Sequence, residues 1–401
     1  MTALLLGMLA VYAAGIVLPL CCSGRPRVQN LLAHTLAGLA GATGMIVGMG
    51  GLLAPAPLTV SFPSTLPLLA FALRLDPLAA FFVLTISLVG LAASIYAVGY
   101  VTEIRGSGSP VAVCSLFNGF LGSMTLVVLA DNGFLFLLVW ELMSLTSYFL
   151  VVTEHQEAEV RHAGFFYLIM THIGTAFIVL AFLLLFREAG TFSFDAFRHP
   201  EQPLSETLRT FVFLAALVGF GTKAGIVPLH VWLPYAHPAA PSHISALMSG
   251  VMIKTAVYGL LRMTFDFLGG QMPWWWGFLL LLIGAVSALL GVMYALMEHD
   301  LKSLLAYHSV ENIGIILLGI GAGMLFHSYG LEELAALGLI AGLYHTINHA
   351  MFKALLFLGA GSLVYATGTR NMEHYGGLLR RMPWTGLCFL IGAVSIAALP
   401  P

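Results

Sequence analysis

Long apolar runs dominate the chain. A run of about 18 or more apolar residues is long enough for a helix to cross the hydrocarbon core of a bilayer. Twelve such runs predict twelve membrane-spanning helices: roughly 3–21, 30–54, 76–100, 111–130, 132–153, 162–186, 208–227, 243–264, 275–297, 303–326, 333–366 and 384–401. The pattern therefore predicts an all-α fold, a polytopic transmembrane helix bundle of about 12 spans.

Composition supports the same class. The 401 residues are 59% hydrophobic and only 8% charged, whereas an average protein carries about 25% charged residues. A water-soluble domain of this size could not bury so much apolar surface. The formal net charge of −2 argues against nucleic acid as a partner. We therefore expect an integral membrane protein.

Proline interrupts two of the predicted spans. Proline removes a backbone donor and disrupts the turn before it. Inside a bilayer such a break survives only where protein or a wet cavity satisfies the freed carbonyl groups. The sequence therefore predicts two broken helices, whose prolines are Pro228, Pro234, Pro238 and Pro241 in the first and Pro400 and Pro401 in the second.

The two breaks indicate an internal repeat. Pro228 and Pro400 lie 172 residues apart, and a similar shift carries Glu141 close to Glu311. A repeat with an odd number of helices inverts its second copy, an architecture common in transporters. We therefore expect inverted five-helix repeats, the second incomplete. The predicted domains are an N-terminal group of three helices at 1–110, a first repeat at 111–264 and a second repeat at 265–401, truncated at its broken helix.

Three of the four lysines lie inside apolar spans: Lys223, Lys254 and Lys353. A charge near the bilayer centre costs about 2.5–3.5 kcal/mol on insertion scales, which is hard to reconcile with residues that have no function. Lysine releases its proton readily when buried, whereas arginine stays charged. Buried lysines therefore indicate proton translocation.

A carboxylate accompanies these lysines. Glu141 lies in the fifth predicted span, where it is either paired with a cation or neutral. A fixed Glu141–Lys223 ion pair that joins two helices is the structural alternative. A switch that uses the same pair to move protons is the functional one.

Histidines form a second group of candidates. His345, His349 and Lys353 follow one another at i, i+4 and i+8, and imidazoles can relay protons because one nitrogen accepts while the other donates. The two histidines could instead hold a metal, but no acidic residue accompanies them as in H-E-x-x-H. The sequence predicts neither a metal site nor a cofactor. Further candidates for proton transfer are His172, His308 and Glu311.

Several longer motifs point to a known family. Residues 140–148 (WELMSLTSY) and 223–234 (KAGIVPLHVWLP) resemble the fifth-helix motif and the broken seventh helix of one family, the antiporter-like subunits of respiratory complex I and of Mrp cation/proton antiporters. Residues 254–262 (KTAVYGLLR) resemble its eighth-helix lysine segment, residues 300–307 (DLKSLLAY) the start of its tenth helix, and residues 349–358 (HAMFKALLFL) its eleventh-helix segment. Three stretches, 170–176, 243–254 and 308–314, most resemble the hydrogenase-4 and formate hydrogenlyase branch.

This resemblance implies roles for individual residues. Glu141 and Lys223 match the family's proton-path pair, Lys254 its bridging lysine, and His349 and Lys353 its later relay. It also implies a membrane subunit, itself not catalytic, that assembles with other membrane and peripheral subunits of a hydrogenase or complex I-like complex. The expected location is the inner membrane of a bacterial or archaeal cell.

Two other hypotheses for the function remain, and the sequence differs from the family pattern at two places. An Mrp-type sodium/proton antiporter subunit is the second hypothesis, and a structural membrane anchor for a hydrogenase arm is the third. The family carries a further ionisable residue beyond the break in its twelfth helix, whereas this sequence stops at Pro401. We therefore expect the chain to be a fragment of a longer subunit. Glu311 stands where complex I subunits usually carry an uncharged residue.

Overall fold

The structure, a computed structural model, describes residues 1–399 except 23, 63–67, 102–109 and 271. In the described part, eleven helices are long and apolar enough to cross a membrane. The twelfth predicted span contains a shorter apolar helix, Pro383–Ile396. The expected all-α polytopic bundle is confirmed: where about 12 spans are predicted, the described residues form eleven full-length spans and one shorter apolar helix.

The chain divides into two compact units, which are described separately. Unit 1 comprises Met1–Lys223 and Lys254–Gly269, and unit 2 comprises Ala224–Ile253 and Gly270–Pro401. The boundaries fall beside two of the buried lysines, Lys223 and Lys254. The division into 1–110 and two five-helix repeats stays a prediction.

Unit 1 is built mainly from eight helices of the described chain. They are α1 (Thr2–Cys21), α2 (Pro26–Leu53), α3 (Pro77–Tyr100), α4 (Pro110–Leu129), α5 (Gly133–Val151), α6 (Ala158–Ala189), the short α7 (Phe194–Arg198) and α8 (Glu206–Ala224). A 3-10 turn η2 (Val152–Glu154), most of α11 (Ile253–Leu261) and the π-helical η4 (Arg262–Phe267) complete it. The helices α2 and α3 pack closely, because a Cβ on Gly48 would lie 2.8 Å from the backbone nitrogen of Leu84.

A β-hairpin in unit 1 was not predicted. Strands β1 (Leu58–Phe62) and β2 (Phe71–Leu75) pair antiparallel, with Leu58 opposite Leu75 and Phe62 opposite Phe71. The strand β2 leads directly into α3, whose first turn is capped by Asp76: its Oδ1 accepts a hydrogen bond from the backbone nitrogen of Ala79 at 2.9 Å. Asp76 is thereby fixed at the N-terminal end of α3.

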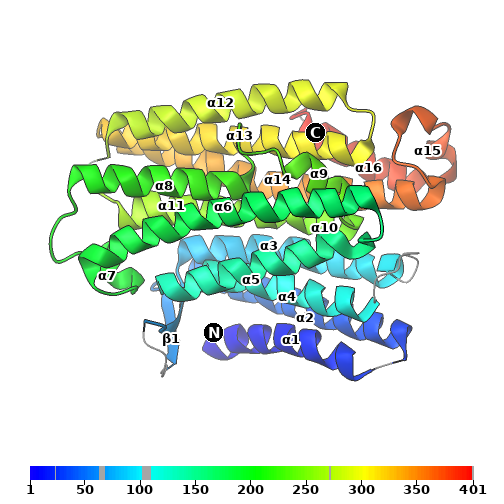
Figure 1. Ribbon diagram of the computed structural model, residues 1–401, viewed down its shortest axis with the longest axis horizontal. Helices are drawn as coiled ribbons and strands as arrows, with labels where there is room; N and C mark the ends of the chain where they lie inside the picture. Colours follow the sequence, from blue (N-terminus) through cyan, green and yellow to red (C-terminus); the bar gives the residue numbers. More distant parts are fainter. Residues whose placement is uncertain (23, 63–67, 102–109, 271, 400–401) are drawn as a thin grey trace. The chain divides into compact units, whose positions relative to one another are not determined.

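Unit 2 carries the first predicted break, at Pro228–Pro241, and three long helices. The second predicted break, at Pro400 and Pro401, lies outside the described residues. The elements of unit 2 are α9 (Leu233–Ala239), α10 (Ser242–Leu247), the π-helical η3 (Met248–Met252), α12 (Trp274–Met297), α13 (Leu301–Ser328), α14 (Glu332–Thr367), the 3-10 turn η5 (Met372–His374), α15 (Leu378–Arg381) and α16 (Pro383–Ile396). The helices α12, α13 and α14 lie side by side in contact (Figure 1). Glycines allow this: a Cβ on Gly284 would lie 2.8 Å from the carbonyl oxygen of Gly314.

The first predicted helix break is confirmed. The helix α8 ends at Ala224, Gly225 has a left-handed backbone with φ of 81°, and the next helix begins only at Leu233. A second interruption separates α9 from α10 at Ala240 and Pro241. The backbone therefore leaves helical geometry twice within the proline-rich segment, and its carbonyl groups need other donors there.

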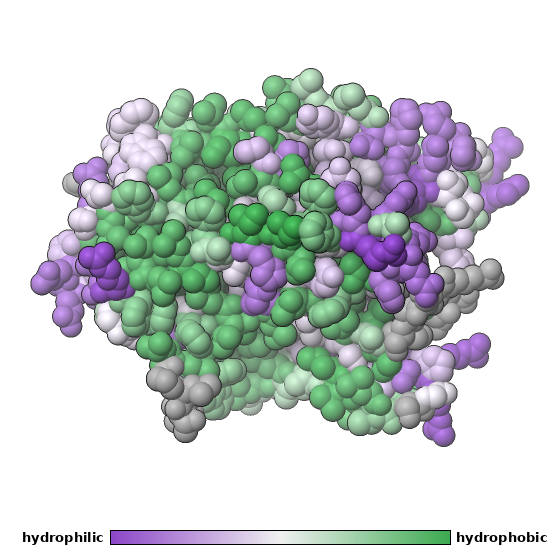
Figure 2. All heavy atoms as spheres, viewed as in Figure 1, coloured by the Kyte–Doolittle hydropathy of each residue, from purple (hydrophilic) through white to green (hydrophobic). Residues whose placement is uncertain are grey.

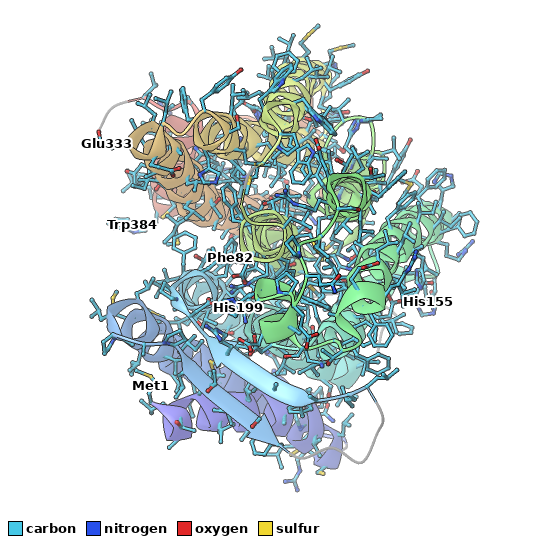
Figure 3. The ribbon with its side chains drawn as sticks, turned by 90° about the vertical axis from the view of Figure 1, so that its left-hand side faces the viewer. Met1, Phe82, His155, His199, Glu333 and Trp384 are labelled. Carbon is cyan, nitrogen blue, oxygen red and sulfur yellow. The ribbon has the colours of Figure 1, made fainter. Side chains whose placement is uncertain are left out.

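Hydrophobic side chains cover most of the visible length of the long helices, and hydrophilic side chains gather towards helix ends (Figure 2). In the interior of unit 1, Phe82 of α3 (Figure 3) meets Tyr258 edge-on, with ring centroids 5.4 Å apart. His155, by contrast, lies on the outside (Figure 3). This distribution is that of an integral membrane protein, as the sequence predicts.

An ion-pair network joins distant segments of unit 1. Arg262 of η4 donates two hydrogen bonds to the Asp76 carboxylate, at 2.7 and 2.8 Å, and one to Asp266 at 2.9 Å. Arg198 of α7 donates to Asp266 at 2.9 Å and to Asp131 at 3.0 Å. Bidentate arginine–carboxylate pairs are among the stronger and more directional ion pairs. The network therefore ties α3, α7 and η4 together.

The network makes the stability of unit 1 depend on pH. Burial alone would raise the pKa of Asp76, but the hydrogen bonds and charge of Arg262 outweigh burial and hold this pKa below its ordinary value. A carboxyl group of this kind stabilises the fold above its unfolded pKa of about 3.9. This stabilisation is lost as the pH falls through the lower pKa of the folded state.

Replacing Arg262 with Met should destabilise the protein by about 3–5 kcal/mol, because Asp76 would keep its buried charge without a partner. The measurement is the thermal unfolding midpoint of the purified protein in detergent. Arg27→Met, at an exposed arginine, is the matched control and should unfold like the wild type. Equal midpoints for both variants would contradict a stabilising role for the network.

Candidate functional site

Glu141 of α5 pairs with His172 of α6. His172 Nε2 lies 2.9 Å from Glu141 Oε1, and His172 Nδ1 lies 2.8 Å from the backbone oxygen of Leu168. A carbonyl oxygen can only accept, so Nδ1 must carry a proton. The contact between Nε2 and the carboxylate then requires a second proton, located either on the imidazole or on Glu141. The pair therefore holds one proton between its two partners.

The Glu141–His172 pair is only partly buried. The side chain of Glu141 is 31% exposed and that of His172 50% exposed. Figure 2 shows a small hydrophilic patch on the otherwise hydrophobic face where α5 and α6 lie side by side. Glu141 is therefore less buried than the lysines of the predicted set.

Lys223, near the end of α8, is buried and bonded to two hydroxyl groups. Its Nζ donates to Ser144 Oγ at 3.0 Å and to Tyr167 Oη at 2.9 Å, and it is 2% exposed. Ser147 Oγ lies 2.6 Å from the same Tyr167 hydroxyl. Glu141 lies close enough to interact electrostatically with Lys223, yet among the described contacts it pairs with His172 and not with this lysine.

Lys254 is the second buried lysine of unit 1. It is 1% exposed and stands near the start of α11. The neighbouring Thr255 Oγ1 lies 3.5 Å from the sulfur of Met143 on α5. The sequence prediction that this lysine is buried is met, and its role as a bridge stays a proposal.

In unit 2, polar side chains link α13 to α14. His308 Nδ1 hydrogen-bonds Glu311 Oε2. Asn312 Nδ2 donates to the backbone oxygen of His308 at 2.7 Å, which leaves Asn312 Oδ1 to accept from His345 Nε2 at 2.9 Å. This orientation requires a proton on His345 Nε2. Three residues of the predicted set, His308, Glu311 and His345, therefore belong to one connected group.

Lys353 and His349 lie deeper in unit 2. Both are fully buried, and Lys353 Nζ donates to the backbone oxygen of Leu305 at 2.6 Å. Ser309 Oγ donates to the same oxygen at 3.0 Å and lies 2.7 Å from Ser249 Oγ. The rings of His345 and His349 are nearly parallel, with centroids 6.3 Å apart. His345, His349 and Lys353 therefore follow one another along α14 at the predicted spacing, with the two histidine rings as neighbours.

Sequence reasoning missed several partners of these residues. Tyr167 reaches Lys223 from α6, and Ser309 and Ser249 share the carbonyl region of Lys353. A hydroxyl residue in an apolar helix carries little signal, because such residues often bond only to their own backbone. Tyr167 is a fully buried tyrosine, and a buried tyrosine usually has a hydrogen-bond partner.

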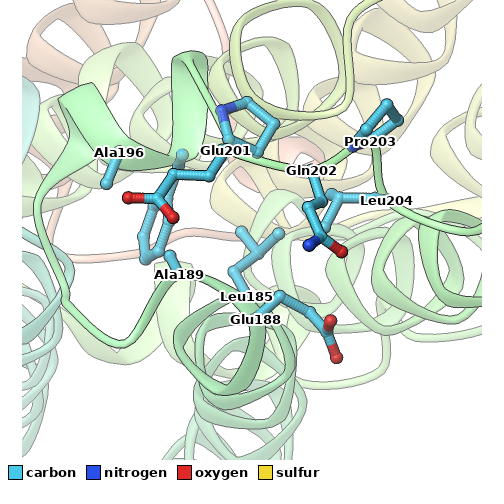
Figure 4. Close-up of a pocket in the computed structure, with 10 residues that line it drawn as sticks. Leu185, Glu188, Ala189, Ala196, Glu201, Gln202, Pro203 and Leu204 are labelled. Carbon is cyan, nitrogen blue, oxygen red and sulfur yellow. The ribbon is translucent and has the colours of Figure 1, made fainter.

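A pocket of about 340 Å³ lies elsewhere in unit 1, beside the C-terminal end of α6 (Figure 4). Glu188, Glu201 and Gln202 contribute its polar side chains, and Leu185 and Leu204 part of its apolar wall. None of the predicted proton-transfer residues lines it. In the described part of the chain, no three histidine, cysteine or acidic side chains cluster closely enough to hold a metal ion.

Known proteins match this chain over most of its length. A family model described as NADH:quinone oxidoreductase/Mrp antiporter, transmembrane, matches residues 130–401. The chain is 45% identical to hydrogenase-4 component B of Escherichia coli, over 92% of this chain and 55% of that protein. It is 36% identical to formate hydrogenlyase subunit 3 of Escherichia coli, over 93% of this chain and 59% of that protein. The chain thus spans little more than half the length of these relatives.

The chain is also similar in structure to a solved protein complex. The Mrp complex from Dietzia sp. aligns with a TM-score of 0.84 and 26% sequence identity, over 100% of this chain and 41% of that chain. The helix bundle of this chain is therefore similar to one in a solved membrane complex.

Replacing Tyr167 with Phe should lower stability by about 1–3 kcal/mol, since the buried ammonium of Lys223 would lose one of its two hydroxyl acceptors. Thermal unfolding of the purified protein in detergent measures the loss. Tyr365→Phe, at a tyrosine that is 62% exposed, is the control. If both variants unfold at the same temperature, the Tyr167 hydroxyl does not hold Lys223.

Proposed function

Because the chain belongs to the NADH:quinone oxidoreductase/Mrp antiporter family of transmembrane proteins, we propose that it is the proton-translocating part of a membrane subunit in a hydrogenase-linked redox complex. The resemblance to antiporter-like subunits predicted from the motifs is confirmed by this match and by the hydrogenase-4 and formate hydrogenlyase relatives. These two relatives are named as components of hydrogenase systems, which favours that branch.

The proton shared by Glu141 and His172 carries the proposal. It stands within electrostatic reach of Lys223, which hydroxyl groups hold in place of a carboxylate. When Glu141 is negative, it stabilises the protonated form of Lys223. When the proton of the pair moves onto Glu141, that stabilisation disappears and Lys223 can release its own proton. The pair can therefore act as the switch.

Unit 2 supplies a second set of groups for the same task. Glu311 interacts electrostatically with Lys353 and is hydrogen-bonded to His308, so a carboxylate, a histidine and a lysine recur there. We assign Lys254 the transfer between the two sets, and His345, His349 and Lys353 the later steps. Redox chemistry in other subunits would supply the free energy that biases the first pair.

A partner subunit should cover the exposed Glu141–His172 pair. Relatives of this chain are subunits of multi-subunit membrane complexes. A charged pair facing lipid is costly, so polar groups inside a membrane normally face protein or water. Covering this face with another membrane subunit removes the cost and places that subunit against the switch. Its conformational changes could then shift the shared proton.

The second candidate is an Mrp-type sodium/proton antiporter subunit, which the match to the Dietzia Mrp complex favours. Sodium would need a cage of oxygen ligands, as hard cations do. Lys223, Lys254 and Lys353 are buried along the proposed route, and their charge repels a metal cation. The described residues therefore fit proton transfer better than sodium transfer.

Glu141→Gln should abolish proton pumping while leaving assembly intact, because the amide keeps the shape but cannot carry the charge that acts on Lys223. Dye quenching in membrane vesicles that contain the native complex measures pumping. Glu188→Gln removes a carboxylate that is 44% exposed in its side chain and should pump normally. Full pumping by the Glu141→Gln variant would exclude this role.

Lys254 can be tested by two substitutions at one position. Arginine keeps the positive charge but cannot release it, since it stays protonated in proteins, and methionine removes the charge while keeping most of the volume. If Lys254 relays protons, Lys254→Arg and Lys254→Met should both lose pumping at matched expression and assembly. An arginine variant that pumps at nearly the wild-type rate would reduce Lys254 to a fixed electrostatic partner.

A further inference from the structure

Lys302 is a buried cation that the proposed proton route does not use. It is 5% exposed and lies in the first turn of α13, where the helix dipole disfavours positive charge. Its Nζ donates to the backbone oxygen of Ala240 at 2.7 Å, just beyond the end of α9. A cation is favoured at that end of a helix, so the contact with α9 offsets the unfavourable position on α13.

Arg370 makes a parallel contact with the same short helix. Its Nη1 donates to the backbone oxygen of Pro238 at 3.0 Å, and its Nε lies 2.9 Å from Asp300 Oδ2. Asp300 also caps α13, since its Oδ1 accepts from the backbone nitrogens of Lys302 and Ser303 at 2.8 and 3.0 Å. The Asp300 carboxylate therefore links the Arg370 guanidinium to the first turn of α13, the turn that carries Lys302.

The carbonyl groups that these cations bind need side-chain donors. The last carbonyl groups of a helix have no partner within it, and Pro241 has no N–H to offer. The structure supplies a donor for each of three: Ser245 Oγ for His237 at 2.7 Å, Arg370 for Pro238 and Lys302 for Ala240. The end of α9 is thus held by two charged groups and one hydroxyl.

This arrangement holds a fully buried histidine. His237 of α9 is 0% exposed, and its ring is nearly parallel to those of Trp232 and Phe357, at centroid distances of 6.1 and 5.5 Å. We propose that Lys302 and Arg370 are positioning residues that hold α9, and with it His237, in the geometry required for proton transfer at the broken helix. The inference rests on the proposed function and adds a site to it.

The first test compares variants of Lys302 in the full-length protein within its native complex. Lys302→Met should lower the pumping rate about tenfold, which corresponds to about 1.4 kcal/mol in the barrier, and should speed hydrogen exchange of the non-proline backbone amides among residues 233–240. Lys302→Arg keeps a charged donor and should retain most of the rate. Arg380→Met, at an exposed arginine of unit 2, should change neither quantity. Unchanged exchange at 233–240 in the methionine variant would overturn the inference.

A double-mutant cycle shows whether Lys302 acts through His237. His237→Gln should itself lower pumping, and Lys302→Met added to it should cost little more, because residues in one interaction network are not additive. An equal loss from Lys302→Met in both backgrounds would overturn the inference. Should the methionine variant fail to assemble, Ser245→Ala, which removes one donor, should show the same coupling with a smaller loss.

Experiments can separate the positioning role of Lys302 from the proposed function. If Glu141→Gln stops pumping while His237→Gln pumps at the wild-type rate, the positioning role is wrong and the proposed function stands. If Glu141→Gln pumps normally, the proposed function is wrong, and amide exchange at 233–240 alone decides whether Lys302 holds α9.

Discussion

A polar group inside a bilayer must find its hydrogen-bond partner within the protein, and helix packing inside each unit follows from this constraint. Lys223 finds hydroxyl groups, Lys353 a backbone carbonyl, and Arg262 two carboxylates. Each of these hydrogen bonds holds one segment against another. The groups that the proposed transport needs therefore also determine how the helices pack. Function and stability are therefore difficult to separate at these positions.

The broken helix applies the same constraint to the backbone. Prolines free carbonyl groups at the end of α9, and side chains from α10 and α13 and from the segment after α14 bond to them. A helix that continued through this region would satisfy its own carbonyl groups and would not need Lys302 or Arg370. The break thus creates binding positions for cations that an unbroken span cannot offer.

Hydropathy and proline positions predicted most of the fold, because apolar length and missing backbone donors are local properties. The long spans and the break after Ala224 follow directly from them. The strand pair Leu58–Phe62 and Phe71–Leu75 was not predicted, because two strands of five residues carry weak sequence signals. The motifs identified Glu141 and Lys223, but not the pairing of Glu141 with His172, which depends on how α5 faces α6. Arg262 lies near the end of the predicted span 243–264, and only the structure shows it to be a buried centre of ion pairing.

The hydroxyl surroundings of Lys223 differ from a carboxylate in one respect that bears on kinetics. A carboxylate can only accept hydrogen bonds, whereas a hydroxyl can also donate. Ser144 and Tyr167 accept from the ammonium group in this structure, and either O–H bond could rotate to donate to a neutral amine. The same two side chains therefore suit both charge states of the lysine. After the lysine proton is lost, rotation about single bonds of these two side chains is enough to restore the hydrogen bonds, without the helices having to separate.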